Sequence, residues 1–221
     1  MNKEVIRKKW EAVLACPLNS VEDLGKLCII ESVERVPMTT KPNKETEVVR
    51  SARIFATAAH AAVGQKRKYS GKDYIVHPEH VASIVASVTD DQNMIAAAWL
   101  HDVIEDTKVT KEQLLEIFDE DVVDLVLWLT DVSKPEDGNR ATRKRIDREH
   151  SASAPARAQT IKYADLISNT SDIVDEDPNF ARVYIKEKEL GLQIVNKGDK
   201  TLLDYALKQI EEAKLKLFPS Q

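Results

Sequence analysis

The sequence predicts an all-α fold, a helical bundle that carries a small helical appendage at its N-terminus. Three observations favour this class. The chain of 221 residues has only 6 glycines, it is rich in strong helix formers, and alternating β-branched segments are almost absent. At about 100 to 200 residues per domain, the length fits one large domain with a single active site.

The first 45 residues are predicted to form the appendage and a linker. Apolar residues recur at helical spacing over residues 2–14, Pro17 ends that pattern, and Ser20 can cap a second short helix. Residues 37–43 contain two prolines, two threonines and no periodic apolar position, which is typical of a linker. The predicted domains are therefore residues 1–45 and residues 46–221.

The main domain begins with an alanine-rich segment, residues 46–65, whose apolar positions predict a core helix. Pro78 suits the first position of the next helix, because it lacks the N–H that would be unpaired there. Two further helix starts are predicted from capping-box patterns, in which a hydroxyl and an amide side chain satisfy free backbone donors. These patterns are Thr89 with Gln92, and Thr110 with Gln113.

Later segments continue the helical pattern. A dense apolar run covers residues 122–129, and a long helix is predicted over residues 155–175. Two C-terminal helices should be divided near Gly198, where glycine can supply a left-handed cap. After the apolar run, residues 134–157 hold seven basic and four acidic residues. This basic segment is either a solvated helix with charge pairs or a surface that faces an anion.

Composition limits the classes of partner. The 32 Lys and Arg residues are outnumbered by 37 Asp and Glu, and the net charge of −5 provides no general field for nucleic acid or an anionic membrane. Apolar runs are shorter than the roughly 18 to 20 residues of a membrane span. We therefore expect a cytoplasmic protein with a small-molecule partner, and the sequence leaves its oligomeric state open. Cys16 and Cys28 are expected to be reduced thiols without a function.

One predicted helix carries unusual polar residues among apolar ones. His101, Asp102, Glu105 and Asp106 follow the apolar segment that contains Trp99. Three carboxylates beside an imidazole repel one another unless a cation compensates their charge. The pattern indicates metal ligands with acid or base groups, and its alternative interpretation is a charged stripe that faces solvent.

Two more residues in apolar surroundings would complete a metal site. His77 precedes a predicted helix, and Asp165 lies within another. Each alone could be structural. Together with His101 and Asp102 they form a mixed imidazole and carboxylate set, which suits Mn²⁺ or another divalent first-row metal and leaves two octahedral positions for water and substrate. An open coordination site indicates catalysis.

The order of these residues resembles that of the HD-domain metal-dependent phosphohydrolases, an all-α superfamily. Within it, several strings are similar to the hydrolase domain of RelA/SpoT proteins and their small single-domain alarmone hydrolase relatives, including the metazoan SpoT homologues. These strings cover roughly residues 46–175. They are Gly64-Gln-Lys-Arg-Lys68, Ser70-Gly71, Tyr74-Ile-Val-His-Pro78, Leu100-His-Asp-Val-Ile-Glu-Asp-Thr107 and Lys162-Tyr-Ala-Asp165 with Asn169.

The resemblance implies a role for each matching residue. His77, His101, Asp102 and Asp165 would hold Mn²⁺ or a related divalent ion. Glu105 and Asp106 would serve the attacking water as catalytic groups. The residues expected to contact substrate are Arg67, Lys68, Ser70, Lys162 and Asn169. For Lys162 and Asn169, an exposed helix flank is the alternative.

Two departures concern substrate choice. Tyr69 lengthens the loop after Lys68 by one residue, and the usual Asp-Arg-Leu-His-Asn motif reads Asp165-Leu-Ile-Ser-Asn169. The function that the resemblance implies is hydrolysis of the 3′-pyrophosphate of guanosine tetra- and pentaphosphate (ppGpp and pppGpp), the alarmones of the stringent response, without synthesis. Two alternatives stay open: the same chemistry on ppApp, a deoxynucleoside monophosphate or the 2′-phosphate of NADPH, and a non-catalytic nucleotide-binding regulator.

Overall fold

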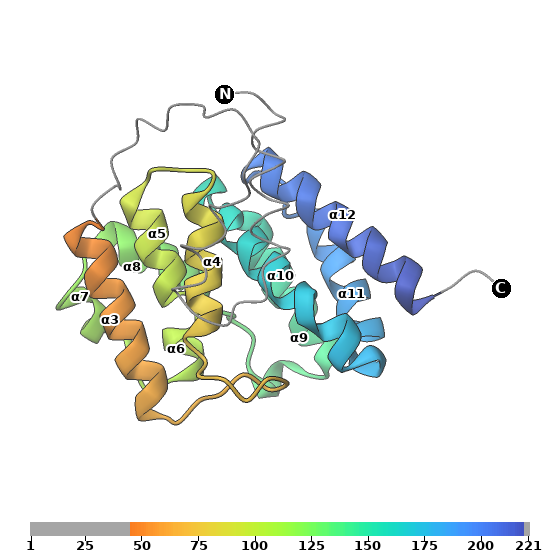
Figure 1. The fold of residues 1–221 in the computed structure, drawn as a ribbon, viewed down its shortest axis with the longest axis horizontal. Helices are drawn as coiled ribbons and strands as arrows, with labels where there is room; N and C mark the ends of the chain where they lie inside the picture. Colours follow the sequence, from red (N-terminus) through yellow and green to blue (C-terminus); the bar gives the residue numbers. More distant parts are fainter. Residues whose placement is uncertain (1–44, 219–221) are drawn as a thin grey trace, which may run out of the picture. The chain divides into compact units, whose positions relative to one another are not determined.

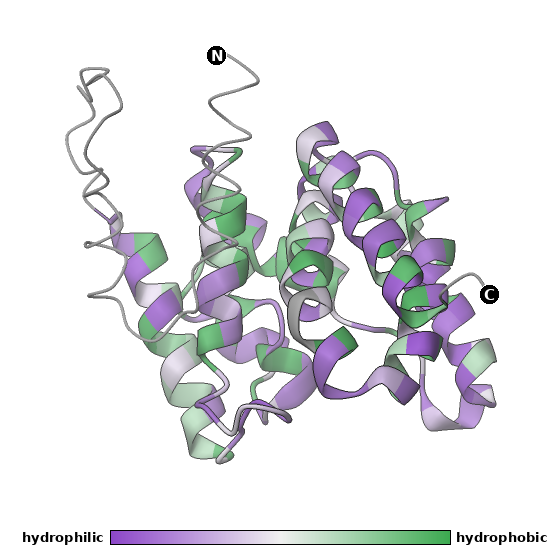
Figure 2. Cartoon of the chain, turned by 45° about the vertical axis from the view of Figure 1, so that its right-hand side comes forward, coloured by the Kyte–Doolittle hydropathy of each residue, from purple (hydrophilic) through white to green (hydrophobic). Residues whose placement is uncertain are grey.

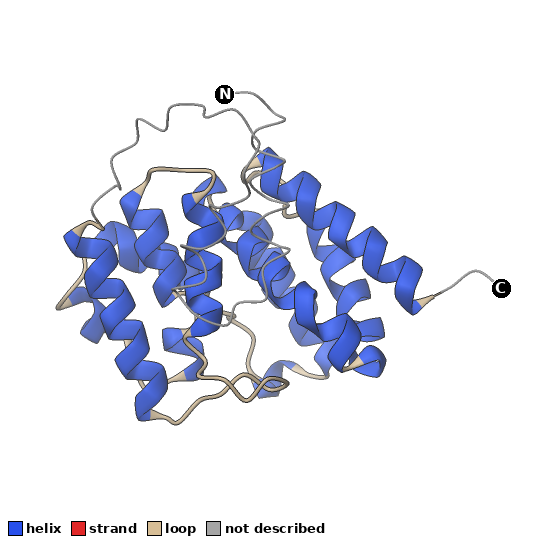
Figure 3. Ribbon diagram, in the orientation of Figure 1, coloured by secondary structure: helices blue, strands red, loops and turns tan. Residues whose placement is uncertain are grey.

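The all-α prediction is confirmed by the computed structural model, which describes residues 45–218 except for the side chains of residues 171 and 172. Over these residues the chain consists of helices joined by loops, with one isolated β-bridge between Lys66 and Asp73 (Figures 1 and 3). The elements are α3 (Glu47–Ala62), α4 (Val76–Ala86), α5 (Gln92–Leu100), α6 (Val103–Asp106), α7 (Lys111–Leu115), α8 (Glu120–Leu129), the 3₁₀ helix η1 (Pro135–Asp137), α9 (Arg140–Ser153), α10 (Ala156–Glu176), α11 (Pro178–Leu192) and α12 (Lys200–Leu217).

Helix α5 forms the centre of one half of the bundle. Its residues Ala96, Ala97 and Ala98 are fully buried, and such small side chains allow α3, α4 and α8 to approach it closely. Helix α10 packs on α4 on one side and on α11 and α12 on the other (Figure 1). Most helices carry both hydrophobic and hydrophilic residues (Figure 2), as expected of helices with one face in a core.

The observed helix starts agree in part with those predicted from the sequence. The capping box of Thr110 and Gln113 is confirmed. The box predicted at Thr89 is wrong, because α5 begins after Asp91, whose carboxylate accepts hydrogen bonds from the backbone N–H groups of the second and third residues of the helix. Pro78 is the third residue of α4 rather than the first, a position within the first turn where its missing N–H still costs no helical bond.

The predicted helix around His101 is interrupted. Helix α5 ends at Leu100, and α6 begins at Val103, with His101 and Asp102 between them. Asp102 has φ −101° and ψ −3°, outside regular helical geometry. The four polar residues predicted to share one helix face are thus divided between a turn and a short helix.

Gly198 serves a different purpose from the left-handed cap predicted for it. Positive φ angles in the described residues occur at Gly64, Gly71 and Gly138 instead. A Cβ atom at Gly198 would lie 2.5 Å from Cε2 of Tyr163 and 2.8 Å from the backbone nitrogen of Thr160. Gly198 is therefore needed for close approach of the α11–α12 connection to α10.

Residues 1–44 lie outside the described part of the chain. The two helices and the linker predicted there, and the expectation for Cys16 and Cys28, therefore fall outside the described residues. The domain boundary after residue 45 stays a prediction. Within the described residues, no helix is long and apolar enough to span a membrane.

Candidate metal centre and active site

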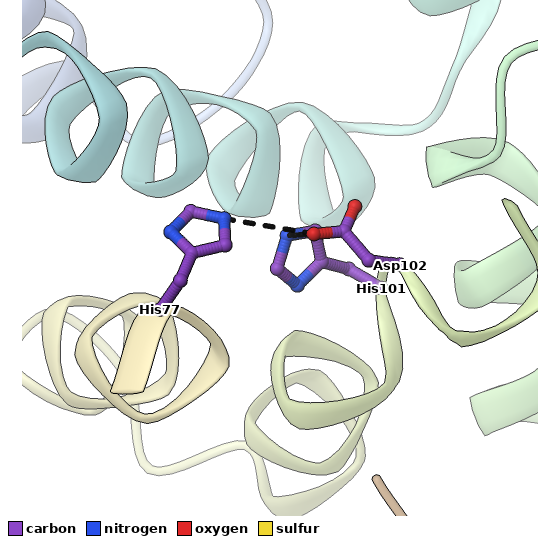
Figure 4. Close-up of side chains that lie close together, drawn as sticks. All are labelled: His77, His101 and Asp102. Atoms are coloured by element: carbon purple, nitrogen blue, oxygen red, sulfur yellow. Dashed lines mark ion pairs between the residues drawn. The ribbon is translucent and has the colours of Figure 1, made fainter. Parts of the chain in front are cut away.

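Three helices bring the four predicted metal ligands together. His77 lies in the first turn of α4, His101 and Asp102 occupy the turn after α5, and Asp165 projects from α10. The ligand atoms of His77, His101 and Asp102 all lie within 4.8 Å of one another. Figure 4 shows these three side chains pointing toward one another. Oδ1 of Asp165 lies 3.2 Å from Nε2 of His77 and 3.8 Å from Nε2 of His101.

The two imidazole rings have the properties of ligands. Their Nε2 atoms are buried and make no hydrogen bond of acceptable geometry within the described residues. Nδ1 of His101 lies 2.8 Å from the carbonyl oxygen of Ala98. Because that oxygen can only accept, Nδ1 carries a proton in either charge state of the ring, and Nε2 presents a lone pair when the ring is neutral. Such an unpaired nitrogen beside carboxylates fits a divalent metal ion.

The hydroxyl of Ser168 contacts the ring nitrogen of His77 that faces away from the carboxylates. Nδ1 of His77 and Nδ1 of His80 each lie 3.0 Å from Oγ of Ser168. The hydroxyl has one hydrogen to give, so it can donate to only one of these rings and must accept from the other. When His77 is the donor, its Nε2 lone pair faces the carboxylates.

The electrostatics of the cluster favour a bound cation. Burial alone would lower the pKa of His101, but the adjacent Asp102 and Asp165 raise it well above its usual value. Burial opposes ionisation of the two carboxyl groups, yet the imidazoles hold the pKa of Asp165 well below its usual range and also lower that of Asp102. The two partly buried carboxylates therefore stay ionised because positive charge lies beside them, and either a protonated imidazole or a bound divalent cation can supply that charge.

Neighbouring polar groups orient the carboxylates. The hydroxyl of Tyr74 donates to Oδ2 of Asp102 over 2.6 Å. The side-chain amide of Asn169 donates to Oδ1 of Asp165 over 2.7 Å, and the guanidinium of Arg67 donates to Oδ1 of Asn169 over 3.1 Å. The predicted substrate residues Arg67 and Asn169 are thus connected to the ligand set.

The two predicted catalytic carboxylates, Glu105 and Asp106, line a cavity that Asp102 and Asp165 also line. Oε2 of Glu105 accepts a hydrogen bond from the backbone N–H of Asp131 over 3.2 Å. Burial, and then the negative charge of Asp131, raise the pKa of Glu105. Oδ2 of Asp106 accepts from Nε2 of Gln65 over 2.8 Å, and Oε1 of Gln65 lies 2.7 Å from Nδ1 of His60.

The remaining predicted substrate residues are placed less directly. Nζ of Lys68 pairs with Asp177 at 3.0 Å, and Oγ of Ser70 accepts a hydrogen bond from the backbone N–H of Lys72. Neither residue lines the cavity. Lys162 does line it, although its ammonium donates to the carbonyl oxygen of Leu129 over 2.6 Å.

The cavity has a volume of about 400 Å³, and part of its wall was missed from the sequence. Helices α9 and α11 supply that part, with cationic and aromatic side chains such as Arg148, Lys188, Phe180 and Tyr184. For α9, the signal that could have found this wall is the helical spacing of polar residues within the basic segment, whereas the residues of α11 lie outside that segment.

Residues 52–187, more than half of the chain, match the family described as the HD domain. This chain belongs to the HD-domain family. The matched range contains all four residues that converge on the buried site, so the His and Asp residues of this HD domain form a site able to hold a divalent metal ion.

Other comparisons agree with the HD domain. A solved structure of a metazoan orthologue of SpoT, described as hydrolysing ppGpp, superposes with a TM-score of 0.66 and 25% identity over 76% of this chain and 94% of that one. A GTP pyrophosphokinase of Brucella ovis is 31% identical over 73% of this chain and 21% of its own length. The bifunctional (p)ppGpp synthase/hydrolase SpoT of Escherichia coli is 37% identical over 48% of this chain and 15% of its own length. This HD-domain chain thus spans about a fifth or less of these curated relatives.

Proposed function

We propose that this HD-domain protein is a metal-dependent phosphohydrolase that removes the 3′-pyrophosphate of ppGpp-like guanosine nucleotides. The observation that carries the proposal is the meeting of two buried imidazole nitrogens, which lack hydrogen-bond partners among the described residues, with two partly buried carboxylates at a cavity. The likeness to the metazoan SpoT orthologue, which extends over most of both chains, supports the substrate class.

His77, His101, Asp102 and Asp165 would hold one divalent ion in this proposal. Their mixture of nitrogen and oxygen atoms suits Mn²⁺ among the first-row metals. When bound, such an ion neutralises phosphate charge and lowers the pKa of nearby water.

Glu105 and Asp106 are proposed to handle the attacking water. Glu105 is suited to accept its proton, because a raised pKa makes an ionised carboxylate a stronger base. Gln65 fixes the direction of the Asp106 carboxylate, which can then hold the water in line with phosphorus. Water attacks the phosphorus next to the 3′ oxygen, the bond between that phosphorus and the 3′ oxygen breaks, and the 3′ oxygen takes up a proton. With ppGpp the two products are pyrophosphate and the nucleoside 5′-diphosphate.

The proposed substrate contacts are Arg67, Lys68, Ser70, Lys162 and Asn169. The cavity position of Asn169 and its hydrogen bonds to both Arg67 and Asp165 support a contact beside the metal. Lys162 has three N–H donors and uses one on Leu129, which leaves donors for phosphate. We also propose that the reaction takes place in the cytoplasm.

The test is to incubate the purified protein and Mn²⁺ with ppGpp, pppGpp, ppApp, NADPH and nucleoside monophosphates, and to identify the phosphorus-containing products. Free pyrophosphate from ppGpp is the expected result. Orthophosphate from a monoester would replace this proposal with a different HD phosphohydrolase, and no turnover of any compound would favour a binding protein.

A matched variant separates chemistry from metal binding. Glu105→Gln combined with Asp106→Asn keeps the shape of both side chains, and it should bind Mn²⁺ as the wild type does while losing hydrolysis. Normal hydrolysis by this variant would disprove the role proposed for the two carboxylates.

A further inference from the structure

Two helices present the same periodic face to the cavity. Residues that line it recur on each helix at i, i+4, i+7, i+8 and i+11, which is one stripe of an α-helix. On α9 they are Arg140, Lys144, Asp147, Arg148 and Ser151, and on α11 they are Phe180, Tyr184, Glu187, Lys188 and Gly191. Neither helix supplies a residue of the metal cluster, so this wall is a separate part of the cavity.

Some cations of this wall already have carboxylate partners. The guanidinium of Arg140 makes two hydrogen bonds of 2.8 Å to Glu187. Nζ of Lys144 lies 2.7 Å from Asp131 and 3.6 Å from Asp147. These side chains therefore neutralise one another within the wall.

Arg148 and Lys188 differ from them. Both are half-buried, and neither takes part in an ion pair among the described residues. Gly191 leaves room for the stem of Arg148, whose Cδ would lie 4.0 Å from a Cβ atom added there. The ammonium of Lys188 lies 5.1 Å from the centre of the Tyr184 ring.

The charge of Lys188 reaches the catalytic end of the cavity. Burial raises the pKa of Asp131, whereas Lys162, Lys144 and Lys188 lower it. Asp131 in turn borders Glu105. The cations of the wall and the carboxylates of the site therefore belong to one continuous electrostatic environment.

A half-buried cation that makes no close ion pair has lost part of its hydration and gains from an anion that enters the cavity. Guanidinium and ammonium groups are suited to phosphate oxygens. A divalent ion held by His77, His101, Asp102 and Asp165 would neutralise one phosphate group of a ligand, which leaves the two cations of the wall for another. A cavity of about 400 Å³ is within the range that takes small-molecule ligands.

We propose that Arg148 and Lys188 form a second anion subsite, which binds a phosphate or diphosphate group of the substrate other than the group that is hydrolysed. The proposal rests on the proposed function, because it assigns the second group to the same nucleotide. It predicts a preference for nucleotides that carry phosphate at two separate positions, and it gives the basic segment of the sequence a role.

The first experiment compares two substrates that differ only at the 5′ position: ppGpp, and guanosine 3′-diphosphate with a free 5′-hydroxyl. The variant is Arg148→Gln with Lys188→Gln. The matched control is Arg145→Gln with Lys186→Gln, which removes the same charge from exposed positions of the same two helices. The ratio of kcat/KM for ppGpp to that for the 5′-hydroxyl compound should fall about 10- to 100-fold in the first variant only, through the loss of charge-assisted contacts. An unchanged ratio, or an equal fall in the control, would overturn the subsite.

The second experiment separates this proposal from the proposed function. GDP, which has a 5′-diphosphate but no 3′-phosphate, is titrated into metal-free protein in the presence of EDTA and followed by calorimetry. Binding should weaken at least about 10-fold in the Arg148→Gln, Lys188→Gln variant, remain in the control, and survive in Arg148→Lys with Lys188→Arg, which keeps both charges. Equal binding by all four proteins, or binding by none, would overturn the subsite whether or not ppGpp is hydrolysed.

Discussion

Asp165→Asn is expected to abolish the stabilisation of this protein by Mn²⁺. Oδ1 of Asp165 is the oxygen that lies 3.2 Å and 3.8 Å from the two unpaired imidazole nitrogens. Asparagine has nearly the same shape but is neutral, so it removes one charged ligand from the proposed set of four with little change in packing. The quantity to measure is the shift in Tm between metal-free and Mn²⁺-loaded protein, since any effect on the metal-free fold cancels from it.

The size of this shift follows from linkage. Metal at 100 times its Kd stabilises the folded state by about 2.7 kcal/mol, and a 100-fold loss of affinity leaves about 0.4 kcal/mol at the same concentration. For a domain of this size, 1 kcal/mol corresponds to roughly 2–4 °C in Tm. The wild type should therefore gain about 5–10 °C, and the variant about 1 °C.

Asp175→Asn provides the matched control for differential scanning fluorimetry. Asp175 lies on the same helix, and its side chain is exposed beside Lys216. This control should keep the full metal-dependent shift. A full shift in Asp165→Asn would refute the reasoning, because the ion would then bind without the carboxylate that the geometry assigns to it.

Three other predictions concern the pH profile, the support of the site and the fold. Asp131→Asn removes a negative charge but keeps the backbone N–H that donates to Glu105, so the pKa of Glu105 should fall. Because a general base acts when it is ionised, the acid limb of the kcat–pH profile should move to lower pH. A shift to higher pH, or no shift, would contradict this prediction. Ser168→Ala should weaken Mn²⁺ binding about 10- to 100-fold by calorimetry, because His77 loses its buried partner. Ser83→Ala, at an exposed site on α4, the helix of His77, should bind Mn²⁺ as the wild type does, and equal affinities of the two variants would exclude this role. Gly198→Ala should reduce the free energy of unfolding, measured by urea denaturation, by about 1–3 kcal/mol, because the added Cβ would collide with α10. Gly191→Ala, whose added Cβ would have no contact under 4.0 Å, should not reduce it. Similar losses in both variants would disprove the steric explanation.

The sequence predicted the helices because their cause is local. Apolar residues at a spacing of three or four positions define one face of a helix wherever they occur, and this rule gave the long helix α10 within a residue at each end. Local rules were less successful where two signals competed. Thr89 has the capping-box spacing, but Asp91, two residues later, caps α5.

The prediction that His77, His101, Asp102 and Asp165 belong to one site also came from the sequence, through residue chemistry and the resemblance of their order. The structure brings all four together. The approach of Gln65 to Asp106 could not be predicted, because it depends on how a loop after α3 folds against α6.

The sequence by itself determined the helices, the types of residue that can bind metal, and their order along the chain. Only the tertiary structure decided which cations face the cavity, which of them lack partners, and why Gly198 must be glycine. The physical reason is range. A helix depends on hydrogen bonds four residues apart, whereas a site depends on the distances between helices, which are set by the packing of side chains far apart in the chain.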